Sequence, residues 1–133
     1  NEVSFALKER KMVATAAIVA AVWRRICSGD TRWGDRESLE GFWSRVASAA
    51  ALPLDPPAGI TALIRRWGVP LPAKPRAHEM DLIAAATESS WGDRLPMLPG
   101  LIAADFIDLL RDSHWSLSRS AMSADDPTIG RRR

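Results

Sequence analysis

The side chains that most often carry catalysis are few in this chain and lie far apart in the sequence. Cys27 is the only cysteine, and His78 and His114 are the only histidines. A nucleophilic thiolate needs a neighbouring base or cation that lowers the pKa of the thiol, and only Arg24 and Arg25 stand close to Cys27 in sequence. We therefore expect Cys27 to pack as a small buried hydrophobe, and the sequence predicts no catalytic residue.

Metal and phosphate motifs are absent as well. The stretch HEMD at 78–81 lacks the second histidine of HExxH, and the chain has no glycine-rich phosphate loop and no GxSxG. Asp105, Asp108 and Asp112 form an acidic row, and a solvated helix face explains this row without a metal. The sequence thus predicts no enzyme, no metal and no cofactor.

Arginine provides 15 of the 18 basic residues and occurs in pairs at the ends of two expected helices. Attraction to a helix C-terminus accounts for one residue of each pair, at about 0.3–1 kcal/mol. Further basic residues in the adjoining loops favour phosphate contacts at one end of a bundle, while helix-end electrostatics stays open as the alternative. The predicted nucleic-acid-binding residues are Arg24, Arg25, Arg32, Arg36, Arg65, Arg66, Lys74 and Arg76.

The charge changes sign along the chain. Residues 1–76 contain 12 Lys or Arg against 7 Asp or Glu, whereas residues 77–126 contain 3 Arg against 9 Asp or Glu. Such an asymmetry steers a polyanion towards the first part and a basic protein partner towards the second.

Apolar residues recur with helical spacing, and the alternation typical of strands is absent. We predict an all-α fold, a small bundle of about five helices. The first helix is apolar nearly all round its middle and should be central. The expected helices cover residues 4–28, 36–50, 60–67, 77–90 and from 99 onward, with a rigid connection at 52–59 and an extended Pro-rich connection at 69–76.

The tetrapeptide WGDR occurs at 33–36 and again at 91–94. In the first copy we expect Gly34 to allow a turn and Asp35 to cap the following helix, with Arg36 pointing outward. Trp33 is expected to fold back over the apolar face of that helix. Duplication of a helical hairpin and coincidence both explain the second copy.

Six tryptophans are many for 133 residues. Those on apolar stripes should be core, whereas those in turns pack over helix starts or stack on a partner. In the fifth helix Ile102, Phe106, Leu109, Leu110 and Ser113 should face inward. The predicted aromatic core is Trp23, Phe42, Trp43, Trp67 and Phe106.

The length predicts a single helical domain over 1–122, with 1–68 and 77–122 as subdomains and 123–133 as a flexible basic tail. The longest apolar run, residues 12–23, is too short to span a bilayer. A lone cysteine suits a reducing compartment, so we expect a cytoplasmic protein without membrane contact.

Residues 31–43, TRWGDRESLEGFW, resemble a tryptophan–glycine–basic stretch that leads into a Leu/Phe helix in some small subunits of CRISPR effector complexes. These subunits form the belly of Cascade-type assemblies in type I and type IV systems. The resemblance implies a non-catalytic subunit that packs on a backbone subunit and guides nucleic acid along a basic groove. Arg32 and Arg36 lie in the matching segment, while the acidic second part departs from the pattern.

These observations predict a non-catalytic subunit of a nucleoprotein assembly that contacts phosphates without base preference, on a guide RNA or a target strand. Two alternatives stay open. One is a DNA-binding accessory protein of helix-turn-helix type, for which residues 60–72 are the candidate segment. The other is a structural adaptor subunit that binds no nucleic acid.

Overall fold

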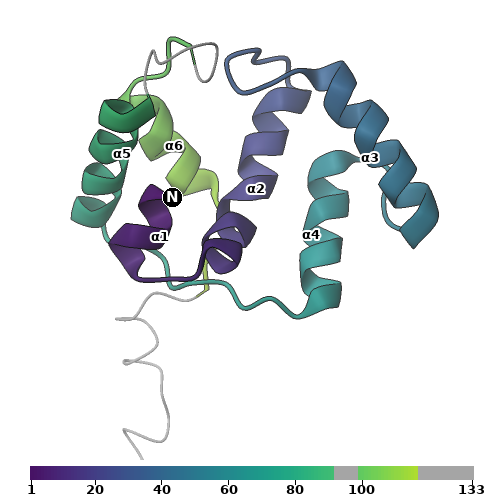
Figure 1. The fold of residues 1–133 in the computed structure, drawn as a ribbon, viewed down its shortest axis with the longest axis horizontal. Helices are drawn as coiled ribbons and strands as arrows, with labels where there is room; N and C mark the ends of the chain where they lie inside the picture. Colours follow the sequence, from purple (N-terminus) through teal and green to yellow (C-terminus); the bar gives the residue numbers. More distant parts are fainter. Residues whose placement is uncertain (92–98, 117–133) are drawn as a thin grey trace, which may run out of the picture.

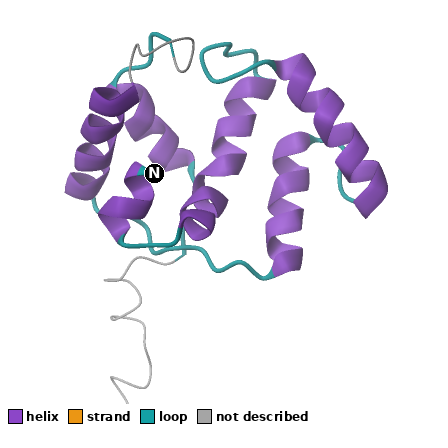
Figure 2. Cartoon of the chain, viewed as in Figure 1, coloured by secondary structure: helices purple, strands orange, loops and turns teal. Residues whose placement is uncertain are grey.

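The computed structural model describes residues 1–91 and 99–116, which form an all-α bundle (Figures 1 and 2). The predicted fold class is therefore confirmed. Among the described residues there are six helices: α1 (Glu2–Leu7), α2 (Lys11–Cys27), α3 (Arg36–Ala50), α4 (Pro56–Trp67), α5 (Ala77–Trp91) and α6 (Ala103–Asp112).

The single first helix predicted over 4–28 is wrong, because the chain turns between α1 and α2. Lys8 adopts a left-handed conformation with φ 55°. The Ser4 hydroxyl donates a hydrogen bond of 2.6 Å to the Glu9 carbonyl and closes the turn. Short side-chain-to-backbone bonds of this kind compete with helix continuation. The break lets α1 fold back and pack on α5.

Helix α2 is central, as its apolar middle predicts. It packs against α1, α3, α4 and α6. The contact surface is made of small side chains, and Ala17, Ala20 and Ala21 are at most 1% exposed. Alanine at these positions lets neighbouring helices approach the α2 backbone closely.

The starts of α3 and α4 are fixed by aspartate caps. The Asp35 carboxylate accepts the Ser38 amide at 2.8 Å, which confirms the predicted cap. Asp55 accepts the Ala58 amide at 3.1 Å, so Pro56 begins a helix at the position where proline is favoured. The rigid connection expected over 52–59 is therefore shorter than predicted.

Helix α3 places Trp43 in the core and Phe42 outside it. Trp43 is 1% exposed, lies edge-on to Trp23 at 5.5 Å, and donates its indole N–H to the Pro53 carbonyl at 2.8 Å. A Cβ atom at Gly59 would overlap the Trp43 indole, so the α3–α4 contact needs glycine there.

Two members of the predicted aromatic core are wrong. Phe42 is 49% exposed and Trp67 is 67% exposed. Both lie on apolar stripes, but α3 and α4 pack on each other and on α2 through the neighbouring positions. Trp43 and Phe106 are confirmed as buried, and Trp23 is partly buried against the Trp43 cluster.

Trp33 does not pack on α3, the helix that it precedes. Instead of covering α3, its ring lies edge-on to Phe106 of α6, with centroids 5.8 Å apart. The expected packing over the α3 start is thus wrong, because the loop between α2 and α3 reaches the apolar surface of α5 and α6.

Helix α5 matches the expected 77–90, but α6 begins at Ala103 rather than near Pro99. Gly100, with φ 72°, forms a turn that delays the helix. The Asp105 carboxylate then accepts the Ile102 amide at 2.9 Å. Ile102 is 57% exposed, contrary to the predicted inward orientation. The inward residues Phe106, Leu109, Leu110 and Ser113 are confirmed as buried.

The Pro-rich connection 69–76 packs against the chain that follows α6. The Ser116 amide donates to the Pro72 carbonyl at 2.9 Å, and Ala73 forms an isolated parallel bridge with Ser116. Pro72 and Pro75 are buried. The division into subdomains 1–68 and 77–122 remains a prediction. Helices α1 and α2, from the first range, pack on α5 and α6, from the second.

Several expectations lie outside the described residues. These are the second WGDR copy beyond Trp91 and the basic tail 123–133. Within the part of the chain that is described, no helix has the length and hydropathy needed to cross a bilayer.

Adjacent residues on α3 allow a matched test of the core. We expect Trp43→Ala to lower the free energy of unfolding by about 3–5 kcal/mol, because it leaves a cavity between α2, α3 and α4. Phe42→Ala should change it by about 0.5 kcal/mol or less, since the ring is largely solvated. Chemical denaturation followed by circular dichroism measures both, and equal losses would show that the assignment of the core face of α3 is wrong.

Candidate functional site

The eight predicted basic residues divide between two ends of the molecule. Helix α2 ends where the α2–α3 loop begins, at the top of Figure 1, whereas α4 ends at the opposite side, where 69–76 crosses beneath the bundle. The expected single band is therefore wrong, because α2 and α4 pack against each other in opposite directions. We call Arg24, Arg25, Arg32 and Arg36 the paired arginines. The opposite end, which carries Arg65, Arg66, Lys74 and Arg76, is called the basic end.

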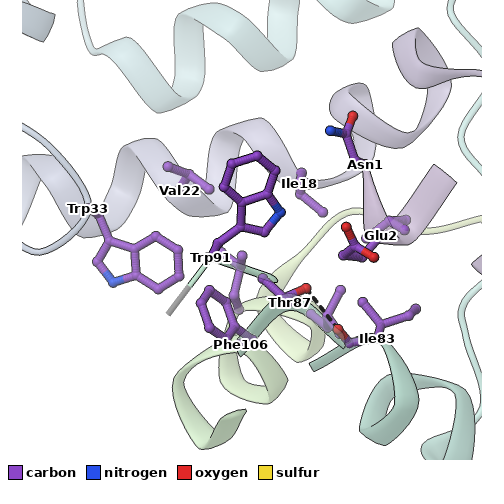
Figure 3. A pocket seen from close by; sticks show the side chains of 12 residues that line it. Asn1, Glu2, Ile18, Val22, Trp33, Ile83, Thr87, Trp91 and Phe106 are labelled. Carbon is purple, nitrogen blue, oxygen red and sulfur yellow. Dashed lines mark hydrogen bonds between the residues drawn. The ribbon is translucent and has the colours of Figure 1, made fainter. Parts of the chain in front are cut away.

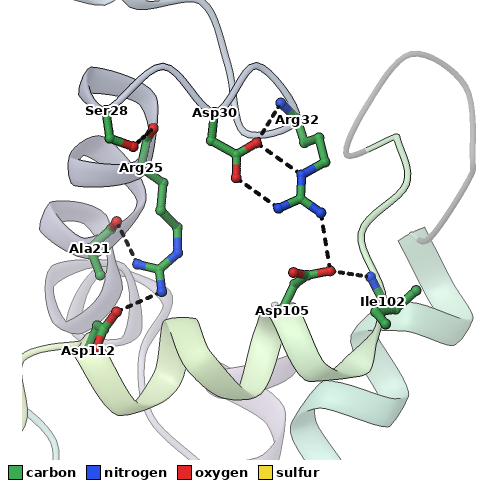
Figure 4. A network of polar contacts seen from close by, with 8 residues as sticks. All are labelled: Ala21, Arg25, Ser28, Asp30, Arg32, Ile102, Asp105 and Asp112. Carbon is green, nitrogen blue, oxygen red and sulfur yellow. Dashed lines mark hydrogen bonds and ion pairs between the residues drawn. The ribbon is translucent and has the colours of Figure 1, made fainter.

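Two of the paired arginines bind the end of α6, and Figure 4 shows one of them, Arg25. The Arg25 guanidinium contacts the Asp112 carboxylate at 2.7 Å and donates to the Ala21 carbonyl at 3.1 Å. Its Cζ atom lies 5.7 Å from the centroid of the Trp33 ring. Arg24 donates to the Asp112 carbonyl at 2.7 Å. These contacts hold the ends of α2 and α6 together.

The other two paired arginines also have acidic partners. Arg32 contacts Asp30 at 2.9 Å and Asp105 at 3.5 Å (Figure 4). The hydrogen bond from Arg32 lowers the pKa of the Asp30 carboxyl below its ordinary value. Arg36 forms an exposed ion pair with Glu40 at 3.2 Å.

The acidic row predicted to face solvent therefore has a structural role in part. Asp105 and Asp112 of α6 both bind arginines from the first part of the chain. No ion pair of the described residues involves Asp108, which is exposed as expected.

At the basic end the cations have few partners. The turn between α1 and α2, the end of α4 and the connection 69–76 all lie at the bottom of Figure 1. In the described part of the chain, no hydrogen bond or ion pair engages six of the basic side chains there, namely Lys8, Arg10, Lys11, Arg65, Lys74 and Arg76. Arg66 differs, because it donates to the carbonyls of Ala50 and Ala51 at 2.7 and 3.4 Å.

Three residues of the basic end were not predicted from the sequence. Lys8, Arg10 and Lys11 lie 54 or more positions before Arg65, and only the turn after α1 places them at the same end as α4. The one local signal was the KERK run at 8–11, which contains a single acid. Further acids in the adjoining start of α5 are Glu79, whose carboxylate accepts the Arg76 amide at 2.8 Å, and Asp81.

An exposed tryptophan accompanies these cations. Trp67 is the last residue of α4, directly after Arg65 and Arg66, and is 67% exposed. Gly68 follows with φ 67° and ends the helix. No described residue bonds to the indole N–H, so a flat apolar face and a free donor stand beside free cations.

His114, which follows α6, is influenced by the positive charges of Arg24 and Arg65. Its amide donates to the Ala17 carbonyl at 2.7 Å, so the residue is anchored on α2. Burial lowers the pKa of the His114 imidazole below its ordinary value, and the charges of Arg24 and Arg65 lower it further.

A separate cavity of about 240 Å³ lies between α1, α2, α5 and α6 (Figure 3). Its lining is mainly aliphatic and aromatic. The Thr87 hydroxyl donates to the Ile83 carbonyl at 2.7 Å, and Glu2 is the only charged side chain of the lining. The lining contains no nucleophile beside a base, and its largely apolar surface suits a ligand that carries an apolar ring.

Cys27, the last residue of α2, is not part of the cavity lining. Burial raises the pKa of the Cys27 thiol, and Glu40 and Asp55 raise it further, which disfavours a reactive thiolate. Among residues 1–91 and 99–116, no group of three His, Cys, Asp or Glu side chains is placed to hold a metal ion.

Comparison with known proteins returned no relatives. No protein-family model matches the chain, and no curated protein and no solved structure matches it.

The lowered pKa of His114 predicts a pH dependence of stability. The His114 imidazole takes up a proton near pH 6.5 in the unfolded chain, whereas in the folded chain it does so only at lower pH. The free energy of unfolding should therefore fall as the pH drops below about 7, and His114→Gln should remove this component. Urea denaturation between pH 7.5 and 5 measures both proteins, and parallel curves would contradict the burial of a neutral imidazole.

Proposed function

We propose that this chain is a non-catalytic, nucleic-acid-binding subunit of a nucleoprotein assembly, and that it contacts phosphates through the basic end. The observation that carries the proposal is the contrast between the two ends of the bundle. Cations at one end are bound to carboxylates and carbonyls, whereas those at the other end, Arg66 excepted, have no partner among the described residues.

Free cations suit phosphate binding better than paired ones do. A phosphate that binds Arg32 must compete with two carboxylates, but one that binds Arg65 or Lys74 has no such competitor. Binding to free cations also releases counterions from the nucleic acid, which supplies most of the non-specific affinity. The proposal therefore moves the phosphate contacts from the paired arginines to Arg65, Lys74, Arg76 and the 8–11 turn.

Trp67 supports nucleic acid as the ligand of this end. The exposed indole offers a flat face beside the cations, and aromatic faces stack on bases of any sequence. Stacking on Trp67 with phosphates on Arg65 and Lys74 gives binding without base preference.

The assembly part of the proposal rests on exposed apolar side chains and on the resemblance of residues 31–43 to Cascade small subunits. Phe42 on α3 and Leu54 in the turn that follows it are 49% and 68% exposed. These positions are the proposed contact with a backbone subunit. Arg36, within the resembling segment, lies on the same helix as Phe42.

The helix-turn-helix alternative is not favoured by the geometry. That motif joins its two helices by a turn of about three to four residues. Here nine residues, 68–76, separate α4 from α5. The adaptor alternative without nucleic acid is an outcome of the experiment below.

Replacing the free cations should weaken nucleic-acid binding by an amount that depends on salt. In Arg65→Ala/Lys74→Ala/Arg76→Ala we expect the slope of log K against log salt to fall by about two to three units, at about 0.7–0.9 per phosphate. Fluorescence anisotropy with unrelated labelled oligonucleotides at several salt concentrations measures the slope. The loss should be equal for all sequences.

The control variant is Arg36→Ala/Arg45→Ala, which removes two exposed arginines from α3, outside the basic end. This variant should bind like the parent at each salt concentration. If the parent does not bind, or if the control loses as much as the triple variant, the proposed site is wrong and the adaptor function becomes the better account.

A further inference from the structure

The cavity between α1, α2, α5 and α6 is large enough for a small ligand. Its volume of about 240 Å³ exceeds the roughly 150 Å³ of an apolar protein cavity that binds benzene. It is smaller than the usual range of drug-sized pockets, about 300–1,000 Å³. The size therefore suits one ring with a short substituent.

The cavity separates two parts of the hydrophobic core. Val3, Ile83 and Leu110 belong to one buried cluster, and Phe106 with Trp33 belongs to another. All five line the cavity. A ligand in this space would join the two clusters through continuous contacts, so it should stabilise the fold.

Aromatic rings surround one part of the cavity (Figure 3). Trp33 and Phe106 meet edge-to-face with ring planes at 81°. In Figure 3 the Trp91 ring lies beside Val22 and Ile18 of α2, and its 40% exposure indicates that it borders the opening of the cavity. Rings in such an arrangement attract flat apolar groups and cations.

Glu2 is the one charged side chain of the lining, and its carboxylate favours a cationic ligand. The Glu2 carboxylate has no hydrogen-bond or ion-pair partner within residues 1–91 and 99–116. In Figure 3 it stands across the cavity from Trp33. A ligand whose ring meets the tryptophans and whose ammonium group reaches Glu2 satisfies both.

We propose that this cavity, between Trp33, Trp91, Phe106 and Glu2, binds a small aromatic amine in its protonated form. The site is independent of the basic end, because its lining includes none of the basic residues there. The carboxylate favours a cation over a neutral molecule of the same shape, and it disfavours an anion.

Three probes of matched shape test the proposal. These are 2-phenylethylammonium, propylbenzene and 3-phenylpropanoate. From the size of the probe we expect a dissociation constant of the order of 0.1–1 mM for the cation. Propylbenzene should bind about three- to ten-fold more weakly, and the anion more weakly still. Titrations followed by the methyl signals of Ile18, Val22 and Ile83 report binding at the cavity itself.

Substitutions assign the two halves of the site. Glu2→Gln should lower the affinity for the cation to about the affinity for propylbenzene, whereas Glu37→Gln on α3 should leave the affinity for the cation unchanged. Trp91→Ala should weaken all three probes. If that variant does not fold, the methyl signals of the parent still decide whether the cavity is occupied.

Several results would overturn the proposal. They are no binding of the cation at 5 mM, binding that leaves the three methyl groups unperturbed, and equal affinity for the cation and propylbenzene. Retention of the cation preference in Glu2→Gln would likewise exclude the assigned carboxylate. None of these results bears on the salt-dependent binding proposed for the basic end.

Discussion

The close approach of other helices to the alanine surface of α2 is the constraint on which the rest of the structure depends. Ala17 and Ala21 are fully buried, and the Ala17 carbonyl accepts the His114 amide at 2.7 Å. A larger side chain here would push α4 or α6 away at a typical cost of 1–3 kcal/mol. Because α4 and α6 both pack on α2, this surface sets the position of the basic end and of the cavity together.

Electrostatics then distinguish the two ends of the bundle. Asp105 and Asp112 come from the acidic part of the chain, and they bind arginines that are 73 and 87 positions away. Part of the opposite charge of the two parts of the chain is therefore neutralised by ion pairs within the molecule. What remains unpaired is concentrated where α4 ends, beside the exposed Trp67. Free charge, and not total charge, is what an external polyanion meets.

Local signals predicted the elements well, and long-range packing explains the errors. The Asp35 cap, the end of the third expected helix at residue 67 and α5 follow from a few neighbouring residues. The break at Lys8 and the pairing of Arg32 with Asp105 depend on partners that meet only in the fold. Phe42 and Trp67 share the helical period of core residues, but a helix stripe is wider than the surface that its neighbours cover, so the period cannot tell which edge is exposed.

The central claim is that nucleic acid contacts the unpaired basic end and not the paired arginines. Amide and indole spectra of the ¹⁵N-labelled chain, recorded during titration with a short single strand at low salt, test it most directly. The account predicts shifts at Arg65, the Trp67 indole, Lys74 and Arg76, with little change at Arg25 and Arg32. Shifts confined to Arg25 and Arg32, or no shifts at all, would contradict it.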